Sequence, residues 1–127
     1  KLLVDSKVIF VGSVENVEEE YKRASFFAMS SLFESFGLVT LEAMACQLPV
    51  VGFQNCPGTN ELVVDKVNGI LVSGSDRVNN FSAGMELLMT DKKLHESLKK
   101  NTKKTVEKFS IRVVTSQWEK LLIKVVN

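Results

Sequence analysis

The sequence predicts an α/β domain in which a doubly wound parallel sheet carries helices on both faces. Short apolar runs of strand type alternate along the chain with longer segments whose apolar residues recur at helical spacing. This alternation continues at least to Val72, and it implies parallel strands joined by right-handed crossovers. Runs such as Val50 and Val51 are β-branched and uninterrupted by polar residues, which is typical of strands buried on both faces.

The first half of the chain contains two expected strands. Residues 8–11 form an apolar run that ends at a Gly-Ser turn, and residues 26–29 form a second run that delivers two serines at its carboxyl end. A helix is expected between them, because Asn16 can cap it and Glu19 stands in the capping-box position. Residues 1–5 are typical of the end of a preceding helix.

The second half of the chain continues the alternation and then becomes helical. Two further strands, two turns and four helices are expected there. They are a strand at 50–53, a turn at 55–58, a short helix at 59–64, a turn at 68–69, a strand at 70–72, a helix capped by Ser75 or Asp76, a helix over 91–109 and an amphipathic helix over 110–127.

Length and composition predict one globular domain over residues 1–127. Hydrophobic residues make up 45% of the chain and charged residues 24%, so disorder is excluded. The net charge of +1 indicates no nucleic-acid partner, and the lysine-rich segment 92–108 is better explained as a solvated helix face. We expect a cytoplasmic location, because no signal peptide and no apolar run of about 20 residues is present.

The sequence contains few residues suited to metal or redox chemistry. Cys46 and Cys56 have neither metal-ligand spacing nor the spacing of a redox pair. The single histidine, His95, lies in the lysine-rich segment and is expected to be exposed. We therefore predict that the chain has no metal site.

The most informative stretch is residues 31–51, which combines a turn, a helix and a buried strand. Gly37 provides a residue that can adopt positive φ or admit a ligand close to the backbone. From Leu38 the apolar residues recur at helical spacing until Pro49, which cannot continue a helix.

Two carboxylates, Glu34 and Glu42, interrupt this apolar stretch. A carboxylate in apolar surroundings is costly without donors, so each is expected to have a partner. One interpretation is that each glutamate caps a helix or pairs with a basic side chain. The other is that both border an anion bound at the helix N-terminus beside Gly37. A phosphate there, with hydroxyl groups accepted by the carboxylates, describes a nucleotide sugar.

The same stretch resembles the signature of the retaining glycosyltransferases of family 4. The resemblance rests on the run Glu34-x-Phe36-Gly37-Leu38, the helix Glu42-Ala43-Met44-Ala45-Cys46 and the following Pro49-Val50-Val51. It implies the GT-B fold, in which two Rossmann-like domains face each other across a cleft. This chain resembles the C-terminal, donor-binding domain.

The resemblance also implies roles for individual residues. Glu34 would lie beside the donor sugar near the anomeric centre, as the catalytic glutamate, and Glu42 would bind the ribose hydroxyls. Backbone N–H groups of Phe36, Gly37, Leu38 and Val39 would contact the donor sugar and diphosphate. The loop of Gly12, Ser13 and Val14 would line the nucleobase, and the segments 57–61 and 68–69 would fix neighbouring loops.

The reaction implied is transfer of a hexosyl-type sugar from a UDP-, GDP- or ADP-linked donor to a glycan or lipid acceptor. Configuration would be retained by front-face attack, without a covalent nucleophile and without a metal ion or other cofactor. Polysaccharide or lipid-linked glycan synthesis is the expected setting. The lysine-rich segment could then contact the inner face of a membrane.

The chain departs from the family pattern at several positions. Ser35 and Gln47 stand where glycine is usual, and Cys56-Pro57 replaces part of a glycine pair. If Gln47 is left-handed, it carries a strain of about 1 kcal/mol. Two earlier strands, an Arg and Lys pair and the N-terminal acceptor domain have no counterpart in this sequence, so the isolated chain is expected to be inactive.

Two other functions remain open at this point. One is a nucleotide-sugar epimerase of GT-B type. The other is a non-catalytic doubly wound interaction or regulatory domain, in which Glu34 and Glu42 would be structural ion-pair partners.

Overall fold

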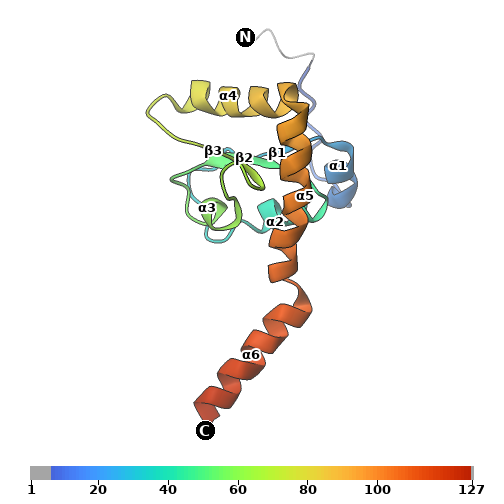
Figure 1. Cartoon of the computed structure of the whole chain (residues 1–127). Coiled ribbons are helices and arrows are strands. Elements are labelled where there is room, and N and C mark those ends of the chain that lie inside the picture. Colours follow the sequence, from blue (N-terminus) through green and yellow to red (C-terminus); the bar gives the residue numbers. More distant parts are fainter. Residues whose placement is uncertain (1–6, 127) are drawn as a thin grey trace.

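Three parallel strands form the centre of the computed structural model, which describes residues 7–126 (Figure 1). The sheet order is β1-β2-β3, with β1 at Phe27–Ala28, β2 at Val50–Phe53 and β3 at Gly69–Val72. The helices are α1 (Val17–Arg23), α2 (Leu38–Ala45), α3 (Thr59–Leu62), α4 (Arg77–Thr90), α5 (Lys92–Lys108) and α6 (Ile111–Val126). The predicted α/β class, with a parallel sheet, is confirmed.

The sheet buries both of its faces, because successive side chains of a strand point to opposite sides. Val51 and Phe53 of β2 pack in one cluster with Leu88 of α4, whereas Val50 packs in another with Met44 of α2. Figure 1 shows α4 along one face and α2 with α3 on the other. Helices therefore cover both faces, as the apolar runs predicted.

The expected strand at residues 8–11 is wrong. This segment is not a strand and pairs with none among the described residues. Its side chains are open to solvent, with Ile9 84% and Phe10 94% exposed. A β-prone sequence needs a neighbouring strand to supply the ladder hydrogen bonds, and β1 pairs here only with β2. The helix end expected at residues 1–5 lies outside the described residues.

Helix α2 ends at Ala45, several residues before Pro49, where the proline itself would stop it. Gln47 adopts φ 61°, and the N–H of Leu48 donates to the carbonyl of Ala43 at 3.1 Å. This left-handed residue closes the helix at Ala45. The condition set for strain at Gln47, a left-handed backbone, is therefore met.

The caps of three helices can be compared with the sequence pattern. Asp76 and Asp91 accept the N–H groups of Asn79 and Leu94, which confirms Asp76 as the cap of α4. Asn16 is the N-cap of α1, but its side chain makes no cap hydrogen bond and instead donates to Glu19 at 3.3 Å. The two side chains contact each other, but neither hydrogen bond of the predicted capping box forms.

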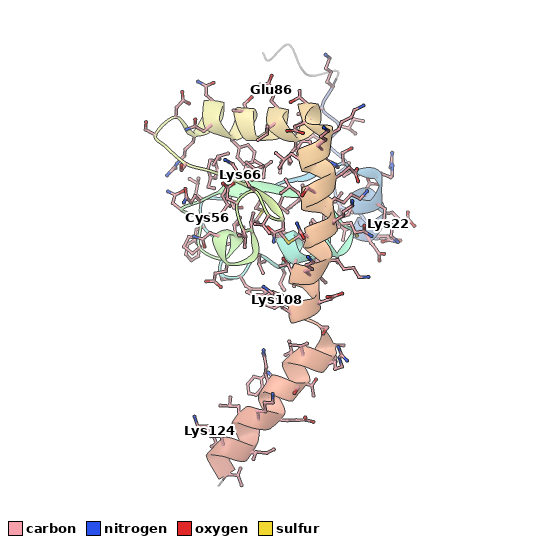
Figure 2. All side chains as sticks on the ribbon, in the orientation of Figure 1. Lys22, Cys56, Lys66, Glu86, Lys108 and Lys124 are labelled. Atoms are coloured by element: carbon pink, nitrogen blue, oxygen red, sulfur yellow. The ribbon has the colours of Figure 1, made fainter. Side chains whose placement is uncertain are left out.

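Helix α6 is the expected amphipathic helix and leaves the rest of the domain (Figure 1). In Figure 2, Lys108 marks the end of α5, and Lys124 lies far along α6. Trp118 is 59% exposed, and α6 has no buried residue. Across residues 7–126, no helix is long and apolar enough to span a bilayer.

Candidate functional site

The turn at Gly37 leaves the N-terminus of α2 open. Gly37 is buried, has φ 80° and provides no side-chain cap. Its carbonyl accepts the N–H groups of Thr40 at 2.9 Å and Leu41 at 3.3 Å. The N–H groups of Leu38 and Val39 have no acceptor in the described part of the chain. These two donors, at the positive end of the helix dipole, can bind an anion.

The loop after β2 supports Glu34 from one side of this turn. The Glu34 N–H donates to the carbonyl of Pro57 at 3.3 Å. Gly58 has φ 79°, and a Cβ there would lie 2.6 Å from the carbonyl oxygen of Glu34. Glycine is therefore required for the two loops to approach so closely. This contact links the predicted segment 57–61 to the predicted catalytic glutamate.

Glu42 lies on the second turn of α2 and faces α1. It lines a groove of about 400 Å³ together with Val17, Glu18, Tyr21, Ala45 and Cys46. Burial raises the pKa of Tyr21 above its usual value, and the negative charge of Glu42 raises it further. The carboxylate of Glu42 is therefore close enough to act electrostatically on the only aromatic residue of α1.

Neither carboxylate has the partner that the sequence predicted. Over residues 7–126, no hydrogen bond or ion pair forms to the side chain of Glu34 or Glu42. The physical reason is exposure, because Glu42 is exposed and Glu34 is only half-buried, so water can solvate both. Both carboxylates are therefore free to accept hydrogen bonds from a ligand.

The remaining predicted site residues contribute in different ways. The side chain of Phe36 is half-buried and packs edge-on against Phe109, with ring centroids 5.4 Å apart. Gly12, Ser13 and Val14 are exposed and lie just before α1. None of these three residues of the predicted nucleobase loop lines the groove at Glu42. Val17, the first residue of α1, does line it.

Two buried hydroxyls near the turn were not singled out by the sequence pattern. Thr40 and Thr59 are fully buried, and neither hydroxyl has a hydrogen-bond partner among the described atoms. Each lies in the first turn of a helix that begins after a positive-φ glycine. Threonine at such a position carries no sequence signal that separates it from an ordinary core residue.

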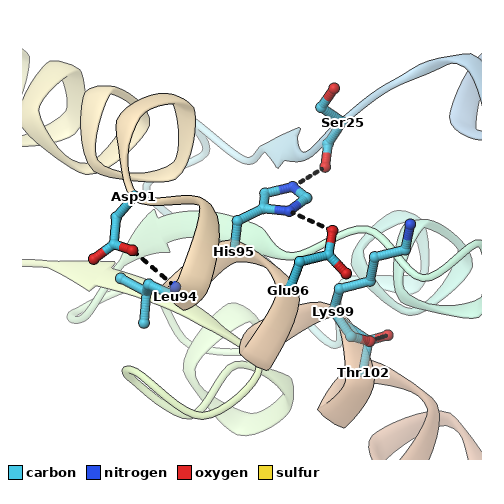
Figure 3. Close-up of polar contacts among 7 residues, drawn as sticks. All are labelled: Ser25, Asp91, Leu94, His95, Glu96, Lys99 and Thr102. Carbon is cyan, nitrogen blue, oxygen red and sulfur yellow. Dashed lines mark hydrogen bonds and ion pairs between the residues drawn. The ribbon is translucent and has the colours of Figure 1, made fainter.

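The histidine lies at the opposite edge of the sheet. His95 is not exposed as predicted, since its side chain is 17% exposed and Nε2 lies 2.8 Å from the carbonyl oxygen of Ser25 (Figure 3). Burial follows from the packing of α5 beneath the segment that enters β1. His95 lines a hollow of about 600 Å³ that is larger than the groove at Glu42 but lies away from Gly37. No His, Cys, Asp or Glu cluster suited to a metal ion occurs in residues 7–126.

Comparison with known proteins gives a consistent set of relatives. Residues 1–105 match the family model described as glycosyl transferases group 1. N-acetyl-alpha-D-glucosaminyl L-malate synthase of Bacillus anthracis is 31% identical over 127 residues, which is 99% of this chain and 33% of that protein. An uncharacterized glycosyltransferase of Methanocaldococcus jannaschii is 33% identical over 130 residues, which is 100% of this chain and 31% of that protein.

Solved structures show the same fold. Sucrose-phosphate synthase from Thermosynechococcus elongatus has a TM-score of 0.83 at 28% identity, covering 97% of this chain and 31% of the other. Anabaena HepE, solved with UDP and glucose, has a TM-score of 0.83 at 24% identity, covering 95% of this chain and 33% of the other. The chain thus spans about a third of the length of the proteins it matches.

Proposed function

On the premise that this chain belongs to the glycosyl transferases group 1 family, we propose that it is the donor-binding part of a retaining glycosyltransferase. The donor is a nucleoside diphosphate sugar, and the acceptor is a glycan or lipid. The acceptor site lies on a further domain, because the chain spans about a third of its relatives.

One observation carries this proposal, namely an open helix N-terminus between two unpaired carboxylates. The free N–H groups of Leu38 and Val39 suit the diphosphate, which is the most highly charged part of the donor. We propose that Glu42, one turn further along α2, accepts the ribose hydroxyls. We propose that Glu34, which precedes the turn, contacts the sugar.

The chemistry follows from this arrangement. Transfer leaves negative charge on the departing diphosphate, and N–H groups at a helix N-terminus stabilise such charge without reorganisation. Glu34 positions the sugar near its anomeric carbon, and attack from the same face retains the configuration. By the family resemblance, we propose that donor binding requires no metal ion. We propose that Gly12, Ser13 and Val14 line the base.

The remaining parts of the proposal concern the whole enzyme. We propose hexosyl transfer in polysaccharide or lipid-linked glycan synthesis, in the cytoplasm or at the inner face of a membrane. We propose that the isolated chain binds nucleotide without transferring sugar, with the acceptor held by the further domain proposed above. Measurable glycosyl transfer by this chain alone would contradict that expectation.

Amide chemical-shift mapping tests the donor site. The labelled chain is titrated separately with UDP, GDP and ADP, first as wild type and then as Glu42→Ala. We expect shifts at residues 12–14 and 37–42 with one nucleotide, and weaker binding in the variant. Glu86→Ala is the matched control, because Glu86 is an exposed helical glutamate on α4 (Figure 2).

The outcomes separate the alternatives. Equal losses for Glu42→Ala and Glu86→Ala would remove Glu42 from the site. Silence with every nucleotide, repeated on a longer chain that includes the preceding domain, would favour the non-catalytic interaction domain.

A further inference from the structure

Tyr21 differs from every other residue of α1. It is the only buried residue of that helix, at 9% exposure, whereas the charged residues around it face solvent. Its ring lies edge-on to Phe27 of β1, with centroids 5.7 Å apart, and it packs in one cluster with Ala43 and Leu48. The ring therefore joins α1 to β1 and to α2.

The hydroxyl of Tyr21 reaches the first turn of α2. It donates to the carbonyl oxygen of Val39 at 3.4 Å. Val39 also carries one of the two free N–H groups at the Gly37 turn. One tyrosine thus holds the same peptide segment that the proposed function assigns to the diphosphate.

Tyr21 also shares a groove with Glu42. Tyr21 and Glu42 line one groove from opposite helices, and the Glu42 charge acts on the phenol. Around Tyr21 the groove presents Glu18 from α1 and Cys46 from the end of α2. Among these groups the Tyr21 hydroxyl is the hydrogen-bond donor already directed at α2.

We propose that Tyr21 is a positioning residue of the donor site. It sets the distance between α1, which carries the nucleobase loop, and the first two turns of α2, which carry Val39 and Glu42. This inference rests on the proposed function, because it concerns how two parts of one nucleotide are held in register. Tyr21 itself is not required to touch the nucleotide.

A double-mutant cycle tests the inference on this chain. Tyr21→Phe removes only the hydroxyl and keeps the ring contacts. The nucleoside diphosphate that binds best in the titration is the probe, and Kd is measured for wild type, Tyr21→Phe, Glu42→Ala and the double variant. We expect Tyr21→Phe to weaken binding about three- to tenfold, the range for one part-buried hydrogen bond. In the Glu42→Ala background the same substitution should weaken binding less than it does in the wild type, because only its effect through the Val39 N–H remains.

A second measurement separates positioning from general stability. In the ligand-free Tyr21→Phe variant, the amide shifts of Val39 and Glu42 should move. Phe81→Leu is the matched control, because Phe81 packs against a core ring, Phe53, at 5.1 Å on the other face of the sheet. It should lower stability without changing Kd.

Each outcome bears on a different claim. The role of Tyr21 would be overturned if the losses in binding free energy of the two single variants simply add in the double variant. It would also be overturned if the amide chemical shifts of Val39 and Glu42 do not change in Tyr21→Phe. Either result would leave the donor site intact. If the wild type binds no nucleoside diphosphate, either alone or within a longer chain that includes the preceding domain, both claims are overturned together.

Discussion

Replacing Gly58 by alanine tests how tightly the loop after β2 holds Glu34. Gly58 has φ 79°, and an L-residue in that conformation is strained by about 1–2 kcal/mol. The new Cβ would lie 2.6 Å from the Glu34 carbonyl oxygen and 3.0 Å from the Glu34 Cβ. Backbone atoms cannot rotate away, so overpacking adds about 1–3 kcal/mol. Together these effects predict a loss of about 2–5 kcal/mol in the free energy of unfolding.

Gly12→Ala is the matched control for this substitution. Gly12 has φ 74°, close to that of Gly58, but nothing lies within 4 Å of its added Cβ. It should therefore lose no more than the strain of about 1–2 kcal/mol. Urea unfolding followed by circular dichroism measures both variants, with an unchanged m-value required for the comparison. If Gly58→Ala loses no more stability than Gly12→Ala, the close contact with Glu34 is not what holds this loop.

Two further predictions concern Gln47 and Tyr21. Gln47→Gly should stabilise the chain by about 1 kcal/mol in thermal denaturation, because it relieves the left-handed strain at φ 61°. Gln54→Gly, at an exposed position without positive φ, should give no gain, and equal effects at both sites would remove strain as the cause. The raised pKa of Tyr21 means that folding disfavours the phenolate, so this contribution to stability is complete below the usual pKa of 10.0 and is lost as pH rises above it. Between pH 8 and pH 11 the free energy of unfolding should therefore fall more for the wild type than for Tyr21→Phe. If the difference in stability between the two proteins is the same at both pH values, the phenol of Tyr21 does not contribute in this way.

Local pattern alone was enough to predict most elements of the fold. The runs at β2 and β3 and the spacing in α4, α5 and α6 are visible because helix and strand periodicities are properties of neighbouring residues. A left-handed Gln47 was considered only as a condition, because the resembled family usually has glycine at that position. The turn at Gly37, with a glutamate on either side, was likewise visible in the sequence.

The predictions that the structure contradicts share one cause. Contacts between segments that are distant in the sequence cannot be deduced from the pattern of neighbouring residues. Residues 8–11 have the composition of a strand, but a strand exists only when a neighbour completes its ladder. Glu34 and Glu42 were expected to be paired because their neighbours are apolar, yet their side chains reach solvent. His95 was expected to be exposed among lysines, yet the helix turns it toward Ser25.

The contacts that complete the site also come from distant segments. Gly58 meets Glu34, and Tyr21 meets Val39, only because the strands bring their loops and helices to the same region. Side-chain chemistry and spacing therefore identify the carboxylates and the helix N-terminus as candidates. Their arrangement, and the contact of Tyr21 with Val39, depend on packing free energies summed over the whole domain, which no single stretch of sequence contains.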